Sequence, residues 1–178
     1  MSTGIALSYG NSVAVPYVRQ FFIGGASSNR GFRFRGVGPG SYSPDEGRDT
    51  TSFAFFDRVG DIKLEANFEY RFPMLISKYL KGAVFLDAGN VWLTKKSGGE
   101  LPEGQFDPNR FYKEIAISAG FGIRLDVQYV IIRFDFGIPI RDPSLPDGER
   151  WLLRDIQVGS RNWRRDNLKF NLAIGYPF

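Results

Sequence analysis

The stretch from Asp61 to Phe72 alternates between apolar and polar side chains without interruption. Successive side chains of a β-strand point to opposite faces of a sheet, so this segment predicts a strand. One face is wholly apolar and the other is mostly charged: Ile62, Leu64, Ala66, Phe68, Tyr70 and Phe72 against Asp61, Lys63, Glu65, Asn67, Glu69 and Arg71. A strand of a membrane β-barrel, with lipid outside and water inside, requires this pattern.

The register of this strand is strongly constrained. A shift by one residue would move Lys63, Glu65, Glu69 and Arg71 into lipid. Each basic residue near the bilayer midplane costs roughly 2–4 kcal/mol, and a one-residue slip reverses every side chain at once. We therefore expect the apolar face to contact hydrocarbon and the charged face to line the interior.

The same alternation recurs along the chain, and it predicts an all-β fold in a single domain over residues 1–178. In the segment 82–94, Val84, Leu86, Ala88 and Trp92 are expected to face outward, and Phe85, Asp87 and Gly89 inward. In the first segment, Ile5, Leu7 and Tyr9 share one side. We expect antiparallel transmembrane strands at 4–10, 61–72, 82–94, 115–127, 130–140 and 168–178.

The composition excludes several classes of function. The chain has no cysteine and no histidine, which removes disulfides, thiolate nucleophiles, Cys/His zinc sites and histidine acid–base chemistry. We expect no metal site, no cofactor and no transmembrane helix, since no run of about 18 apolar residues occurs. The net charge of +4 is modest, and the Lys and Arg residues fall in interior strand faces and loops, so we expect no nucleic-acid partner.

Short and long connections alternate. Residues 73–81 and 126–129 form short links, whereas 16–60, 95–111 and 141–167 are long and rich in Gly, Pro, Ser and charge. Outer-membrane barrels have short periplasmic turns and long extracellular loops. We therefore expect the long loops on the cell surface and Phe178 in the periplasm.

The longest connection contains the segment FFIGGASSNRGFRFRGVGPG, residues 21–40. Taken alone, it is typical of a Gly-rich surface loop, in which Gly supplies positive φ angles. A phosphate-binding loop is disfavoured, because no terminal Gly-Lys-Ser/Thr and no following helix pattern are present.

In its context this segment resembles the BamA/TamA family of outer-membrane assembly factors, which belong to the POTRA-containing surface antigens. Four features in the order of the family carry the resemblance: Arg30-Gly31-Phe32 after Gly24-Gly25 and Ser27-Ser28; Gly60-Asp61 with Glu69-Tyr70-Arg71-Phe72-Pro73; Val84-Phe85-Leu86-Asp87-Ala88-Gly89-Asn90-Val91-Trp92; and Ser118-Ala119-Gly120-Phe121-Gly122-Ile123-Arg124 followed by Gly137-Ile138-Pro139-Ile140 and a terminal aromatic residue. The segments 9–12 and 38–42 are most similar to TamA-like members from Bacteroidetes.

The resemblance implies a specific interior contact. In this family the long loop, here about residues 17–60, folds back into the barrel lumen, and its arginine meets acidic residues of the wall. The matching positions are Arg30, Glu69 and Asp87, and the alternation already places both carboxylates on the inner face. Gly31 would allow a sharp turn and Phe32 would pack against the wall. The alternative for Glu69 and Asp87 is a solvated inner face without a special partner.

The resemblance also implies a larger barrel, of 16 strands. Six strands cannot close a membrane barrel, since single-chain bacterial barrels start at about eight strands. The segment before the first strand shows no signal peptide. We therefore expect the remaining strands to come from missing N-terminal sequence, together with POTRA domains, or from a second chain.

The end of the chain resembles the signal by which outer-membrane barrels are recognised for insertion. Its alternating apolar residues end in an aromatic one: Phe170, Leu172, Ile174, Tyr176 and Phe178. A neighbouring sheet edge can recognise such a segment by strand addition. In the family this closing strand pairs weakly with the first strand, and that seam is thought to open laterally.

Two functions remain open at this stage, with integration in the Gram-negative outer membrane common to both. The first is a non-catalytic factor that inserts client outer-membrane proteins, and the second is a two-partner-secretion transporter or diffusion pore. A soluble β-barrel or sandwich is a third, less favoured possibility. An arginine cluster in the last long loop would either contact lipopolysaccharide phosphates or form ion pairs within a solvated loop: Arg150, Arg154, Arg161, Arg164 and Arg165.

Overall fold

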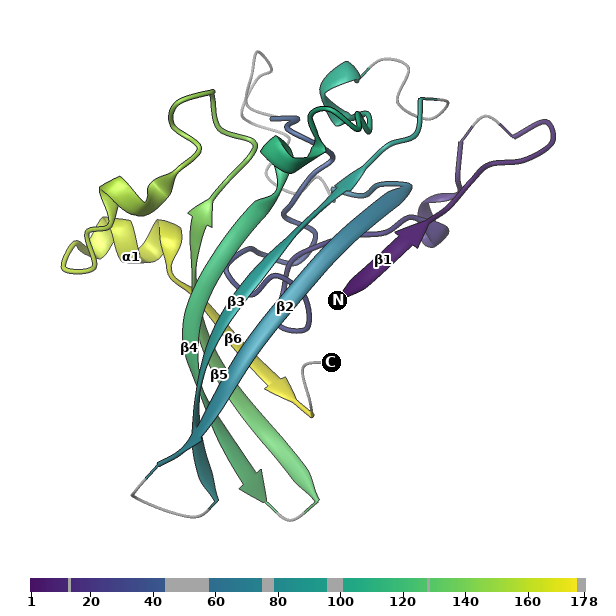
Figure 1. The fold of residues 1–178 in the computed structure, drawn as a ribbon. Coiled ribbons are helices and arrows are strands. Elements are labelled where there is room, and N and C mark those ends of the chain that lie inside the picture. Colours follow the sequence, from purple (N-terminus) through teal and green to yellow (C-terminus); the bar gives the residue numbers. More distant parts are fainter. Residues whose placement is uncertain (13, 44–57, 75–78, 96–100, 128, 176–178) are drawn as a thin grey trace.

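A computed structural model describes residues 1–12, 14–43, 58–74, 79–95, 101–127 and 129–175. Its main element is one antiparallel sheet of six strands in the order β1-β2-β3-β4-β5-β6. The strands are β1 (Ser2–Ile5), β2 (Ile62–Pro73), β3 (Leu80–Trp92), β4 (Ala116–Val127), β5 (Val130–Arg141) and β6 (Lys169–Ile174). The sheet curls like part of a barrel wall around a long inner segment (Figure 1).

The expected division into two faces is confirmed. On the outer face, Phe68, Leu86 and Phe121 are exposed, and Phe68 and Leu86 are directly opposite each other in the β2–β3 pair. On the inner face, Asp87 and Asp135 are fully buried. Residues far apart in the sequence thus share a polar interior because the strands keep the register that the alternation required.

Aromatic side chains form a row on the outer face across β4, β5 and β6. The ring centroids of Phe121 and Phe136 lie 5.1 Å apart, and those of Phe136 and Phe170 lie 5.2 Å apart. Such pairs contribute beyond their buried area. No second layer of described residues covers this face in Figure 1, unlike the sheet-on-sheet packing of a soluble sandwich.

The first strand is shorter than expected and begins earlier. We expected it at 4–10, but β1 ends at Ile5, which pairs with Ile62 at the very start of β2. The Ala6 amide still donates to the Asp61 carbonyl, after which the chain bends at Gly10, whose φ is 64°. Alternation alone could not show that β2, the partner strand, begins only at Ile62 and so limits the length of β1.

Trp92 is not exposed on the outer face, where we expected it. It is fully buried beneath the β3–β4 connection, where its indole Nε1 donates to Glu114 at 2.6 Å and its ring contacts Phe106 and Phe111. The connection contains two 3-10 turns, η2 (Pro102–Gly104) and η3 (Phe111–Glu114). The pattern of a strand indicates which way a side chain points but not which loop covers it.

The other connections also contain short helical elements that the sequence did not predict. They are η1 (Tyr17–Arg19), η4 (Leu152–Asp155) and α1 (Arg161–Asn167). Ser160 caps α1 by accepting from the Trp163 amide. No helix in the described part of the chain is long and apolar enough to cross a membrane.

Arginine at position 68 should destabilise the folded protein more than arginine at position 72. Phe68 lies mid-strand on the outer face, and Phe72 lies near the end of β2. We expect Phe68→Arg to cost about 2–4 kcal/mol and Phe72→Arg about 0–1 kcal/mol, since burying charge in lipid is depth-dependent. Urea unfolding of the complete protein in lipid vesicles measures both values, and equal losses would contradict a lipid-facing β2.

Candidate functional site

The inner loop, residues 17–43, lies against the inner face of the sheet (Figure 1). Two backbone bridges shape it, Phe21 with Gly60 and Ile23 with Val37. Ile23, Phe32, Val37, Val91 and Ala116 form its small apolar core. Since Val91 lies in β3 and Ala116 in β4, this cluster fixes the loop to the wall and gives Phe32 the packing role that we expected of it.

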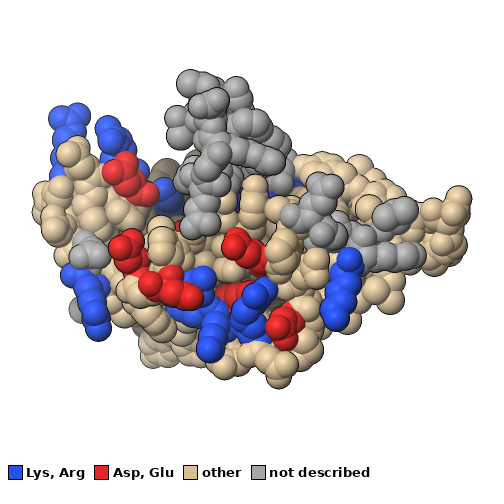
Figure 2. Space-filling model, turned by 90° about the horizontal axis from the view of Figure 1, so that it is seen from above, with Lys and Arg blue, Asp and Glu red and all other residues tan. Residues whose placement is uncertain are grey.

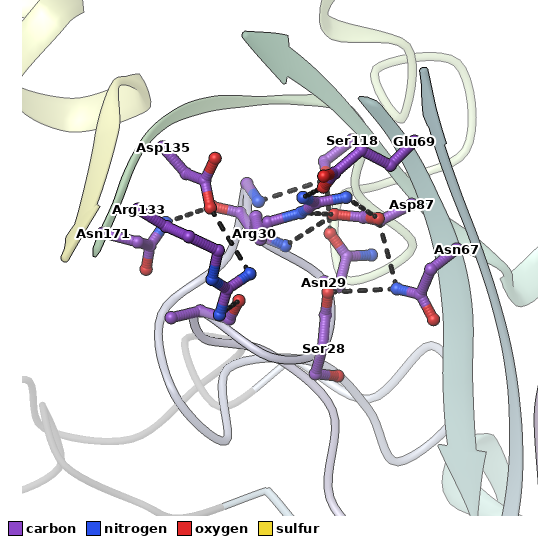
Figure 3. Close-up of polar contacts among 12 residues, drawn as sticks. Ser28, Asn29, Arg30, Asn67, Glu69, Asp87, Ser118, Arg133, Asp135 and Asn171 are labelled. Atoms are coloured by element: carbon purple, nitrogen blue, oxygen red, sulfur yellow. Dashed lines mark hydrogen bonds and ion pairs between the residues drawn. The ribbon is translucent and has the colours of Figure 1, made fainter. Parts of the chain in front are cut away.

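Arg30 lies in the inner loop and is fully buried. Its Nε and Nη2 donate to the two carboxylate oxygens of Asp87, at 2.8 and 2.9 Å. Its Nη1 forms an ion pair with Glu69, and its backbone amide donates to Asp87 at 3.1 Å (Figure 3). The structure thus brings together the three residues that the sequence singled out, in the two-pronged geometry that only a guanidinium provides.

The Phe85 ring completes the Arg30 site. The Arg30 guanidinium carbon lies 3.7 Å from the centroid of this ring, close enough for a cation–π contact. Phe85 and Asp87 are two residues apart in β3, so both point inward. A single strand therefore supplies a carboxylate for the edge of the guanidinium and an aromatic face for its plane.

The acidic partners are tied into a wider network of arginines. Arg124 of β4 bridges two carboxylates, with 2.8 Å to Glu69 and 2.5 Å to Asp135. Arg71 also pairs with Glu69 at 2.6 Å. Arg133 lies 3.7 Å from Asp135 and donates to the Ala26 carbonyl of the inner loop. Charges buried on the wall are therefore paired, as burial of charge requires.

Gly31 sits where a side chain would not fit. A Cβ at this position would lie 2.3 Å from the Ser118 Cβ and 2.8 Å from the Ile138 carbonyl oxygen. The Gly31 amide donates to the Ser118 hydroxyl at 3.1 Å, and Ser118 in turn donates to the Asn29 side chain at 2.5 Å. The glycine is needed because the loop approaches the strand so closely at this point. We expected a glycine here for a different reason, a sharp turn of the backbone.

Arg30 also reaches the last two strands through its carbonyl. The Asn171 side chain of β6 donates to the Arg30 carbonyl at 2.9 Å. On β5, a Cβ at Gly137 would lie only 2.5 Å from the same oxygen. Together with Glu69 on β2 and Asp87 on β3, these contacts make one loop residue touch four strands. In Figure 3, Arg30 lies between Asn171 on one side and Asp87 on the other.

Several of these partners were missed by reasoning from the sequence. Ser28 donates to Glu65 at 2.6 Å, and Asn67 donates both to Asp87 and to the Ser28 carbonyl at 3.1 Å. The alternation had placed Glu65 and Asn67 on the inner face, and Asn171 on the polar side of its strand. Their position was therefore visible in the sequence, but their partner in a distant loop was not.

The residues of the expected terminal signal lie on the outer face where the structure describes them. Phe170, Leu172 and Ile174 are exposed and alternate with Lys169 and Asn171. Tyr176 and Phe178 lie outside the described residues. In the described sheet β6 is an edge strand that pairs with β5 alone, along residues 132–137.

The carboxylates of this site are engaged in charge pairing. Glu69, Asp87 and Asp135 each have an arginine within ion-pair distance. Among the described residues, no group of three or more Asp or Glu side chains is placed to hold a metal ion. The physical effect of these paired charges is to hold the inner loop against four strands.

Replacing Arg30 should release the inner loop. Arg30→Ala leaves Asp87 and Glu69 buried with one partner fewer, which typically costs about 3–5 kcal/mol. Arg30→Lys keeps the charge but loses the two-pronged contact, so we expect an intermediate loss. Limited proteolysis of the complete protein in detergent measures cleavage within 17–43. The control is Arg19→Ala, an exposed arginine of the same loop, and equal cleavage of both alanine variants would contradict the role of Arg30.

Comparisons with known proteins agree with this architecture. The whole chain, residues 1–178, matches the Omp85 superfamily domain. It is 28% identical to the outer membrane protein assembly factor BamA of Neisseria meningitidis serogroup B (strain ATCC BAA-335 / MC58), over 78% of this chain and 18% of that protein. A crystal structure of BamA from Haemophilus ducreyi lacking POTRA domains 1–3 superposes with a TM-score of 0.52 at 21% identity, covering 90% of this chain and 28% of that one.

The chain therefore spans less than a third of either relative, and the structural likeness concerns the fold. The alternation of the strands, the six-stranded sheet and the match over the full length lead to one conclusion. This chain belongs to the Omp85 superfamily and forms part of an integral β-barrel of the bacterial outer membrane.

Proposed function

We propose that this chain is the part of an outer-membrane assembly factor that holds an interior loop and presents an edge strand to client proteins. The observation that carries the proposal is Arg30, which contacts β2, β3, β5 and β6 from within the barrel wall. The similarity to an assembly factor of Neisseria supports the same function. The proposed activity requires no catalysis and no cofactor.

The edge strand β6 provides the proposed contact with clients. It has six residues, half the length of β5, and it leaves a row of backbone groups without a partner among the described strands. An exposed strand edge adds a further strand by main-chain hydrogen bonds. Because the same edge in lipid leaves unpaired groups at several kcal/mol each, a client strand would be strongly favoured there.

The inner loop would regulate this edge through Asn171. The Asn171 side chain is the described contact between β6 and the Arg30 carbonyl, while the Arg30 side chain is held by β2 and β3. The position of β6 is thereby linked to strands on the opposite side of the curl. A loop that stays in place would stabilise β6, and a displaced loop would free it for lateral opening.

The partners that follow from this function are client outer-membrane proteins and the lipid bilayer with its lipopolysaccharide. POTRA domains and further barrel strands, or a second chain, would complete the machine. A diffusion pore is less favoured, because the inner loop fills the space beside β2 to β6 with buried side chains. Conductance of the complete protein in planar bilayers separates the two, since a diffusion pore gives large, steady openings.

The complete protein with Arg30→Ala should fail to support assembly. The reason is that the loop loses its two acidic partners and no longer sets the position of the edge strand. The measurement is complementation of a strain depleted of the native protein, with client levels in the outer membrane as readout. Arg19→Ala should complement normally. Full complementation by Arg30→Ala, with unchanged heat-modifiable gel mobility, would contradict the proposal.

Asn171→Ala should loosen β6 selectively. Loss of one hydrogen bond is worth about 1 kcal/mol, so amide exchange in 169–174 should rise by roughly fivefold. Amides of β2 should not change, because the Arg30 side chain keeps its partners there. Hydrogen–deuterium exchange of the complete protein measures both segments, with Asn162→Ala on the exposed side of α1 as control. Equal acceleration in β2 and β6 would contradict a selective link.

A further inference from the structure

The connection between β5 and β6, residues 142–168, extends outward from the sheet beside β5 and carries η4 and α1 (Figure 1). Trp151 fixes its base, since it forms a backbone bridge with Arg141 at the end of β5. The Arg141 guanidinium carbon also lies 5.4 Å from the centroid of the Trp151 ring. A tryptophan at the end of a barrel strand is typical of the membrane–water interface.

This connection exposes an apolar surface next to that interface. Four apolar side chains within a stretch of eight residues are exposed: Trp151, Leu153, Ile156 and Val158. Gly148, Trp151, Leu153 and Arg154 line a cleft of about 260 Å³. This volume accommodates part of one acyl chain. Neither the inner loop nor the edge strand β6 contributes to the lining of this cleft.

Arginines accompany the apolar residues. Residues 150–167 contain five arginines and two aspartates. Arg154 and Arg161 are exposed, and they have no ion pair with any side chain that the structure describes. Arg164 donates only to the carbonyls of Val158 and Gly159 among described residues. Figure 2 shows Lys and Arg side chains projecting from the left edge, the side on which α1 lies in Figure 1.

We propose that the β5–β6 connection binds a phosphorylated glycolipid of the outer leaflet. The cleft beside Trp151 and Leu153 takes a segment of one acyl chain, and Arg154 and Arg161 contact its phosphate groups. Guanidinium groups bind phosphate with paired hydrogen bonds. The long connections are expected on the cell surface, where such lipids present phosphates at the level of the loop base. This site deepens the proposed function, which counts lipopolysaccharide among its partners, but it uses neither Arg30 nor the edge of β6.

The test uses the complete protein purified in detergent and phosphorylated lipid A as probe, with binding followed by native mass spectrometry. Fully dephosphorylated lipid A and phosphatidylglycerol are the comparison lipids. Each arginine near a membrane phosphate should contribute about a fivefold change in affinity, so Arg154→Gln with Arg161→Gln should weaken binding by roughly twenty-five-fold. Trp151→Ala should weaken binding of phosphorylated and dephosphorylated lipid A alike, since it removes a wall of the cleft.

The control is Lys113→Gln, which removes an exposed positive charge from another long connection at the same end of the sheet. An equal loss in the control would show non-specific electrostatic attraction and overturn the site. If phosphatidylglycerol bound as strongly as phosphorylated lipid A, the assignment to a glycolipid would be overturned. Heat-modifiable gel mobility establishes that each variant is folded. Client assembly by the same variants is a separate readout, so failure of the lipid site and failure of the proposed function are distinguishable.

Discussion

The buried pairing of Arg30 with Asp87 is the interaction on which the interior of this structure depends. A guanidinium and a carboxylate removed from water cost several kcal/mol each unless their geometry is nearly ideal and every remaining donor is used. Here two nitrogens meet two oxygens, a third nitrogen meets Glu69, and the plane of the guanidinium lies on Phe85. This site and the small apolar core around Phe32 together hold the inner loop against the wall.

The outer face obeys a different constraint, and the two together explain the composition of each strand. Lipid requires an uninterrupted apolar surface, while the loop requires charged and small residues directly behind it. The β4 strand shows both, with Phe121 outside and with Ser118 and Arg124 inside. A register error would therefore damage lipid contact and loop contact at once, which explains why the alternation is so regular.

That regularity is also why much of the fold could be predicted from the sequence. Period-two patterning identified the strands and the inward side of Glu69 and Asp87, and the family motif indicated which arginine would meet them. Patterning is local, so it could not show that the short β1 ends opposite Ile62 or that a loop covers Trp92. The contact of Asn171 with the Arg30 carbonyl joins positions 141 residues apart, and no local signal specifies it. The number of strands in the whole barrel and the similarity to TamA-like members from Bacteroidetes stay predictions.

Glu69 and Asp87 are not equivalent, although both hold Arg30. Glu69 also pairs with Arg71 and Arg124, whereas among described residues Arg30 is the cation bonded to Asp87, with Asn67 as its neutral neighbour. Departure of the loop would leave Glu69 neutralised by arginines of the wall, but it would leave Asp87 without its described cation and with only the neutral Asn67 beside it. Partial withdrawal of the loop is therefore penalised as heavily as complete withdrawal. The loop should occupy two states, bound in the interior or fully displaced, with no stable intermediate.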